Sequence, residues 1–68
     1  MSVIKSIELV GSSPNGFDVA VKDAFNEAKK TIRNIRGIRV QDMEVLVEND
    51  EIKEYQARIK LFFTVKKK

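Results

Sequence analysis

The chemically capable residues of this 68-residue chain are carboxylates, basic side chains and a few amides, because it contains neither cysteine nor histidine. A disulfide, a thiol nucleophile, a histidine-based triad and a zinc site of the common kind are therefore excluded. Four carboxylates form two pairs at a spacing of two residues, which places both members of a pair on one strand face. The pairs are Asp42 with Glu44 and Glu48 with Asp50. They could serve acid–base chemistry or bind a cation, but a solvated or intersubunit face explains them more simply.

The glycines and serines form no catalytic or phosphate-binding motif. Gly11, Gly16 and Gly37 make neither a dinucleotide-binding fingerprint nor a Walker loop. Ser12 and Ser13 have no basic partner nearby in the sequence, and their residue types suit a turn and a helix cap. Because no nucleophile–base pair is found, we do not expect an enzyme, and we assign no metal ligand.

Gln56 is the most interesting polar residue, because it lies in the middle of an alternating segment, between Glu54 and Arg58. Its amide offers two donors and an acceptor, enough to pair with the edge of a flat heterocycle, although the polarity of an exposed strand face also accounts for it. Among the aromatic residues, only Phe62 shares this polar parity. Phe62 could line an interface or contact a flat ligand.

Composition and charge exclude further classes of partner. The net charge is +3, with 43% apolar and 34% charged residues, which is typical of a folded chain. A basic block, an acidic block and a second basic block follow one another, but the exposed aromatic residues of a single-strand nucleic-acid surface are missing. No apolar run approaches the ~20 residues that span a bilayer. We expect a cytoplasmic protein that binds neither nucleic acid nor membranes.

The first half of the chain predicts a strand followed by an amphipathic helix. Residues 3–10 are predicted to form a short apolar strand, and residues 11–16 a turn in which Ser13 caps the helix and Pro14 occupies its first position. Asn15, with Asp18 three residues on, is a competing helix start. The helix is expected to extend to about Ile35 and to end at Gly37. Its apolar stripe recurs at steps of three and four: Phe17, Val21, Ala24, Phe25, Ala28, Ile32 and Ile35.

The last 30 residues predict a long β-hairpin, with strands at 38–48 and 52–65 joined by a turn at Asn49 and Asp50. In the second strand the residues alternate strictly. One face, from Tyr55 to Val65, is apolar and is expected to lie against the helix, while the other is polar. The first strand changes phase, which a bulge near Gln41 and Asp42 would reconcile.

This order predicts an α+β fold in a single domain over residues 1–68: a β-α-β-β chain with a three-stranded antiparallel sheet in order 1-3-2. One helix lies on one face of the sheet. A compact chain of this length has a radius of gyration of roughly 11 Å, whereas the 52–65 strand would reach about 47 Å. The strand overhangs its own core, and one helix cannot cover both faces. We therefore expect a homo-oligomer.

Three strings in this order resemble the dodecin family of small flavin-binding proteins. They are the opening Ile7 to Ser13, the helical segment Ala28 to Arg33, and Glu54-Tyr55-Gln56 followed by alternating residues to Phe63. The resemblance covers essentially the whole chain. It implies a hollow homododecamer in which long curved sheets wrap around helices and flavins bind in pairs at subunit interfaces. The implied role is flavin storage or sequestration.

The resemblance also implies roles for individual residues. Gln56 matches the glutamine that hydrogen-bonds the isoalloxazine ring, and Gly37 stands where flavin-binding members have a stacking tryptophan. This chain contains no tryptophan, although the Arg36 guanidinium could partly substitute for it. The expected cofactor-binding residues are Gln56, Gly37, Ile38 and Arg36, with FMN, riboflavin or FAD as ligand. The alternative is a non-flavin shell that binds metal ions or a phosphorylated ligand, or that is purely structural.

Overall fold

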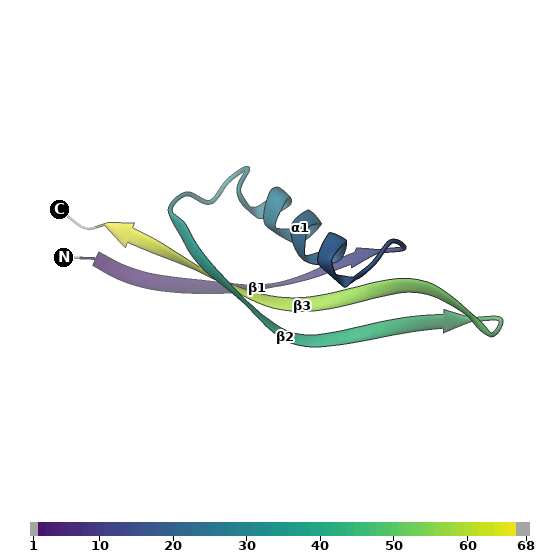
Figure 1. Cartoon of the computed structure of the whole chain (residues 1–68). Coiled ribbons are helices and arrows are strands. Elements are labelled where there is room, and N and C mark those ends of the chain that lie inside the picture. The colour runs from purple at the N-terminus through teal and green to yellow at the C-terminus, as the bar shows by residue number, and fades with distance from the viewer. Residues whose placement is uncertain (1, 67–68) are drawn as a thin grey trace.

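The computed structural model describes residues 2–66 and contains four elements. They are β1 (Ser2–Ser13), α1 (Phe17–Ala28), β2 (Ile35–Glu48) and β3 (Glu51–Lys66). The strands form one antiparallel sheet in the order β1-β3-β2, and α1 lies on one face of it (Figure 1). The predicted α+β fold and its 1-3-2 strand order are confirmed.

β3 is the central strand and the longest element, with 16 residues. It pairs with β1 in unbroken register from Ser2–Lys66 to Ser13–Tyr55. Its pairing with β2 is interrupted between Val40 and Asp42, which leaves Gln41 as the predicted bulge. Asn49 and Asp50 both have positive φ values, 53° and 63°, as the tight turn of a β-hairpin requires.

The helix contacts the sheet through a ridge of small residues. Ala20, Ala24 and Ala28 are its buried side chains, and they recur every four residues along one line of the helix. Ala57, Ile59 and Leu61 of β3 are also fully buried, as the alternation predicted. Close contact is possible because β1 carries Gly11 at this point. A Cβ atom on Gly11 would collide with the carbonyl oxygen of Ala20 and lie 3.1 Å from the Ala24 Cβ.

The helix is shorter than the sequence predicted, because it ends at Ala28 and not near Ile35. Backbone bonds from Thr31 and Ile32 to Ala28 continue it as a turn. Asn34 then takes a positive φ of 63°, and its carbonyl accepts a hydrogen bond from the Thr64 N–H at 3.1 Å. From this point the chain forms hydrogen bonds with β3 and no longer follows the helical spacing of its apolar residues. Gly37 consequently lies inside β2, and the prediction that it ends the helix was wrong.

The start of the helix also differs from the prediction. Gly16, with a φ of 146°, is the N-cap residue of α1. Because glycine has no side chain, no side-chain hydrogen bond caps the helix. The Ser13 hydroxyl instead accepts a hydrogen bond from the Asn15 N–H at 3.0 Å, which stabilises the turn before the helix. Ser13 and Pro14 are therefore turn residues, because the tight turn around Ser13 delays the first helical residue to Phe17.

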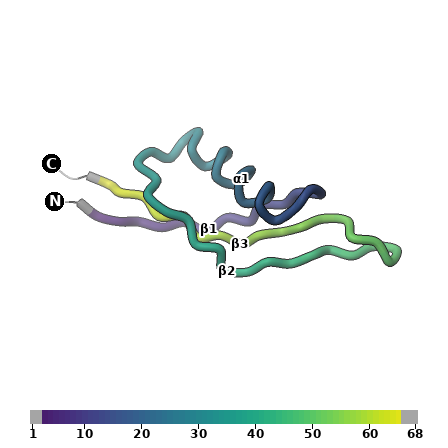
Figure 2. Tube along the Cα trace, in the orientation of Figure 1, coloured from purple at the N-terminus to yellow at the C-terminus, as the bar shows by residue number. Residues whose placement is uncertain are grey.

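The molecule is elongated, with extents of 55 × 20 × 13 Å and a radius of gyration of 14.2 Å. This exceeds the roughly 11 Å of a compact chain of the same length. The tube trace shows the cause: the β2–β3 hairpin projects beyond the helix at one end, while β1 and β3 run on together at the other (Figure 2). The overhang that we predicted from strand length is therefore present.

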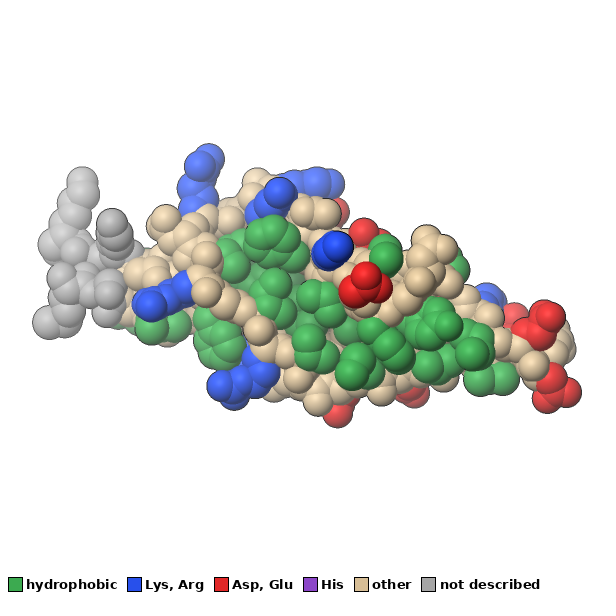
Figure 3. Space-filling view, in the orientation of Figure 1, with side chains coloured by type: hydrophobic (Ala, Val, Ile, Leu, Met, Phe, Trp, Pro, Cys, Tyr) green, Lys and Arg blue, Asp and Glu red, His purple; other side chains and the backbone are tan. Residues whose placement is uncertain are grey.

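β2 carries a row of exposed apolar side chains on the helix side of the sheet, here called the β2 apolar stripe. The helix packs on β1 and β3 and leaves this row uncovered. Figure 3 shows the resulting hydrophobic band, which continues toward the hairpin turn. The stripe consists of Ile38, Val40, Met43, Val45 and Val47, which are 36–64% exposed. An apolar surface of this kind indicates an interaction site.

The contact at Gly11 yields a prediction about stability. We expect Gly11→Ala to lower the free energy of unfolding by about 1–3 kcal/mol, because the added methyl group collides with helix backbone that cannot move aside. Gly37→Ala is the matched control. A Cβ there meets nothing within 4 Å, so stability should be unchanged or raised by up to about 1 kcal/mol. Chemical denaturation measures both, and equal effects of the two variants would contradict the interpretation.

The β2 apolar stripe yields a prediction about assembly. Met43 is 60% exposed in the subunit, so Met43→Asp should leave the subunit core intact. If the stripe is buried between subunits, the added carboxylate should block assembly, because an unpaired charge is costly to bury. Asn26→Asp adds the same charge at an exposed helical position and should leave assembly unchanged. Light scattering reports the mass, and a large oligomer of Met43→Asp would contradict the assignment.

Candidate ligand-binding face

The sheet has a second face, on the side opposite α1, here called the helix-free face. Alternate residues of β3 point into it because their neighbours Ala57, Ile59 and Leu61 lie beneath the helix. The register adds the residues directly opposite on β1 and β2. The β3 members are Gln56, Arg58, Lys60 and Phe62. Their partners include Ser12, Val10 and Glu8 of β1, and Glu44, Asp42, Arg39 and Gly37 of β2.

The first hollow on this face surrounds Gln56, has a volume of about 240 Å³ and contains both kinds of charge. Gln56 is half-buried, and in the strand register it stands opposite Ser12 of β1 and Glu44 of β2. The hollow is lined by Val10, Asp42, Glu44, Gln56 and Arg58 of this face, and by Met43, which belongs by its register to the opposite face and follows the bulge at Gln41. An amide, two carboxylates and a guanidinium together supply donors and acceptors for the edge of a polar ring.

The second hollow lies at Gly37 and has a volume of about 350 Å³. Gly37 stands directly opposite Phe62 in the sheet, and a Cβ at Gly37 would meet nothing within 4 Å. The Arg39 guanidinium carbon lies over the Phe62 ring, 5.5 Å from its centroid, in a cation–π contact. Arg36 and Ile4 complete the lining. The register shifts between Ile35 and Gly37, so Arg36 is the extra residue at this point.

The predicted site residues are divided between the two hollows and the two faces. Arg36 and Gly37 line the second hollow, whereas Gln56 lines the first. Gly37 is level with Phe62, six positions beyond Gln56 on β3, which corresponds to about 20 Å along the strand. Ile38 is level with Leu61, so its side chain belongs to the β2 apolar stripe and only its backbone is near Gly37. One subunit therefore does not bring the four residues together.

Sequence reasoning missed Arg39, which lies beside Phe62. Arg39 belongs to the first basic block of the sequence, which runs from Lys29 to Arg39, and its face cannot be assigned when Gly37 is taken as a helix end. A strand starting at Ile35 gives Gly37 and Arg39 the same parity, and this is the signal that would have found it.

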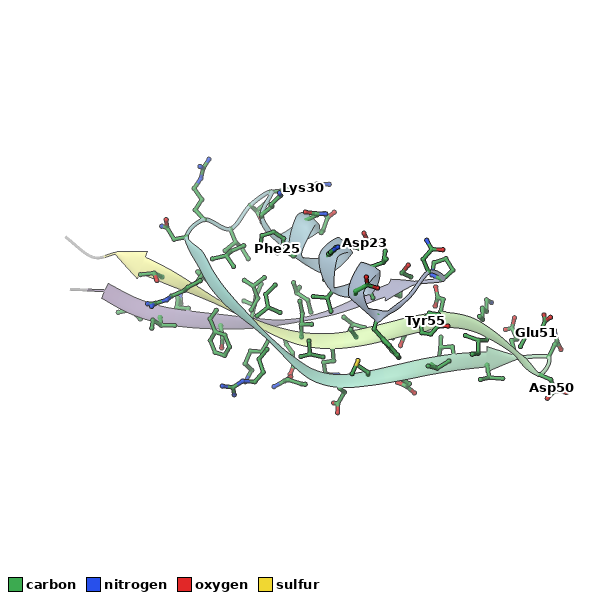
Figure 4. All side chains as sticks on the ribbon, in the orientation of Figure 1. Asp23, Phe25, Lys30, Asp50, Glu51 and Tyr55 are labelled. Carbon is green, nitrogen blue, oxygen red and sulfur yellow. The ribbon has the colours of Figure 1, made fainter. Side chains whose placement is uncertain are left out.

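Two groups of carboxylates lie on the β2–β3 hairpin, one in the first hollow and one at the turn. Across residues 2–66, no group of three or more carboxylates is arranged to hold a metal ion. Asp42 and Glu44 share the first hollow, but Arg58 lies directly opposite Asp42 and competes with any cation there. At the hairpin turn, Asp50 and Glu51 point outward from the tip (Figure 4). Within the same described range, no helix is long and apolar enough to cross a membrane.

The chain combines a long curved antiparallel sheet, one helix on one face and open hollows on the other face. The family model for dodecin matches residues 3–66, and the chain belongs to the dodecin family. It is 33% identical to the dodecin of Thermus thermophilus over 61 residues, 90% of this chain and 88% of that protein. It is 27% identical to the calcium dodecin of Mycobacterium tuberculosis over 66 residues, 97% of this chain and 93% of that protein.

Solved structures agree with this assignment. The crystal structure of the tt0972 protein from Thermus thermophilus superposes with a TM-score of 0.93 at 29% identity, and all of both chains is covered. The calcium dodecin of Mycobacterium tuberculosis superposes with a TM-score of 0.71 over 97% of this chain and 91% of that one. The subunit fold implied by the sequence resemblance is thus confirmed, and a dodecameric assembly is consistent with it.

Proposed function

We propose that the protein is a dodecameric flavin-binding dodecin that stores or sequesters FMN, riboflavin or FAD without turning it over. The observation that carries this proposal is Gln56. It is half-buried in an open hollow of the helix-free face, and the resemblance to dodecins assigns it the role of the ring-binding glutamine. The absence of a nucleophile–base pair from the sequence supports binding without catalysis.

The distance between the two hollows supports an intersubunit site. A flavin ring system is shorter than the ~20 Å between the levels of Gln56 and Gly37, so a flavin that contacts both must take them from different subunits. The β2 apolar stripe offers a surface through which subunits can associate while the helix-free face remains available to ligand. In this proposal the binding site exists only in the assembled shell.

A second candidate function is a shell that binds a cation instead of flavin. It is favoured by the similarity to the calcium dodecin and by Asp42 and Glu44, which share the Gln56 hollow. Titration of Ca²⁺ followed by calorimetry distinguishes the two functions. Binding of Ca²⁺ that is lost in Asp42→Asn, together with absence of FMN binding, would favour the cation-binding shell. The visible absorption of flavin in a freshly purified preparation would favour flavin storage.

Restoring the missing indole tests the flavin proposal. We expect Gly37→Trp to tighten FMN binding by about 1–3 kcal/mol, the scale of burying a large apolar side chain, and to quench flavin fluorescence. The position can accept the side chain, because Gly37 does not have a positive φ and a Cβ there is unobstructed. A fluorescence titration of FMN into wild type and variant measures both effects. If the variant assembles normally but binds no better than wild type, this hollow is not a flavin site.

Removing the amide tests the role of Gln56. We expect Gln56→Ala to weaken FMN binding by about 1 kcal/mol, because the hydrogen bonds to the ring edge are lost. Gln41→Ala is the matched control, since Gln41 is the exposed bulge residue of β2 and the only other glutamine. Its FMN affinity should equal that of wild type. Equal weakening by both substitutions would assign the effect to assembly and not to a ring contact.

A further inference from the structure

The cross-strand neighbour of Gly37 is an aromatic residue. Phe62 and Gly37 are directly opposite in the antiparallel pairing of β2 and β3. The side chains of such a pair project from the same face of the sheet, with Cβ positions about 4.5–5.5 Å apart. A ring carried at position 62 therefore reaches nearly the same space as a ring carried at position 37.

The hollow around this pair provides room for a ring face. Phe62 is half-buried and lines the 350 Å³ hollow, and the glycine opposite leaves the space beside it open. The Arg39 guanidinium carbon lies over the Phe62 ring, 5.5 Å from its centroid, in a cation–π contact. Arg36 adds a second positive charge to the lining. The hollow thus combines an aromatic surface with a cationic rim.

We propose that Phe62, with Arg39 beside it, replaces the missing tryptophan as the residue that stacks on the flat ring of the ligand. The aromatic contact has moved across the strand pair from position 37 to position 62. This inference rests on the proposed flavin-binding function and adds its ring-contacting residue. In this proposal Phe62 is a ligand-binding residue of the second hollow. The alternative is that Phe62 only covers the sheet and makes no contact with the ring of the ligand.

A gain of quenching tests the proposal directly. Excited flavin loses its emission when an indole in contact transfers an electron to it, whereas a phenyl ring is too difficult to oxidise to do so. FMN bound to wild-type protein should therefore remain fluorescent, and FMN bound to Phe62→Trp should lose most of its emission. Phe63→Trp is the matched control, because Phe63 is the next residue and points to the opposite face of the sheet. Its bound FMN should remain as fluorescent as in wild type.

Affinity provides an independent measurement. Phe62→Leu keeps an apolar side chain but removes the ring, so we expect FMN binding about two- to tenfold weaker, the range that an aromatic contact is worth. Phe63→Leu should bind FMN with the affinity of wild type. Light scattering confirms that each variant has the wild-type mass. Should the position-62 variants fail to assemble, wild-type protein with ¹³C-labelled phenylalanine decides the question, because bound FMN should shift one ring system selectively.

The outcomes separate this inference from the proposed function. Fluorescent FMN binding by wild type, quenching by Phe62→Trp and weakening by Phe62→Leu support it. If wild type binds FMN and neither Phe62→Trp nor Phe62→Leu changes the fluorescence or affinity of the bound FMN, the role of Phe62 is overturned. Flavin binding itself would then still stand. The role of Phe62 is likewise overturned if FMN binds to the ¹³C-labelled wild type without changing the chemical shifts of any phenylalanine ring. No FMN binding by wild type or by Gly37→Trp overturns both.

Discussion

The structure depends on a mismatch of length between its central strand and its helix. β3 has 16 residues and α1 has 12, which corresponds to about 53 Å of strand beneath about 18 Å of helix. The helix can therefore cover only the middle of β1 and β3, and β2 keeps its apolar residues in solvent. Among the residues that the structure describes, Ile59 and Leu61 are the large side chains that the subunit buries completely. A small core beside a long exposed apolar stripe is the pattern of a subunit that buries further apolar surface on assembly.

Most of the fold could be predicted because β3 and α1 carry clear periodicities. The alternation from Tyr55 onward identified the central strand and the residues beneath the helix, and the phase change at Gln41 located the bulge. The end of the helix could not be predicted locally, since Ile32 and Ile35 continue the helical spacing. What ends it is the pairing of Ile35 with Phe63, which lies far along the chain. Such a contact leaves no signature in the sequence around Ala28.

The candidate site was predictable only in part, for the same reason. The face of Gln56 followed from the alternation of β3. The position of Gly37 depends on two register irregularities, at Arg36 and Gln41, and a single misplaced residue exchanges the faces of every side chain between them. The family resemblance, which identified positions one at a time, could not show that Gln56 and Gly37 occupy separate hollows within one chain.

The order of the strands has a consequence for synthesis. β3 lies between β1 and β2 in the sheet but follows both in the sequence. On a ribosome, β1 emerges first, and α1 and β2 are synthesised before β3, the strand with which β1 pairs. Until then its backbone groups and those of β2 have no partner in this sheet, which leaves both strands open to pairing with other nascent chains. The sheet can therefore form only after β3, the last of its three strands in the sequence, has been synthesised. Chains that are translated close together on one messenger RNA are then the nearest copies available for assembly.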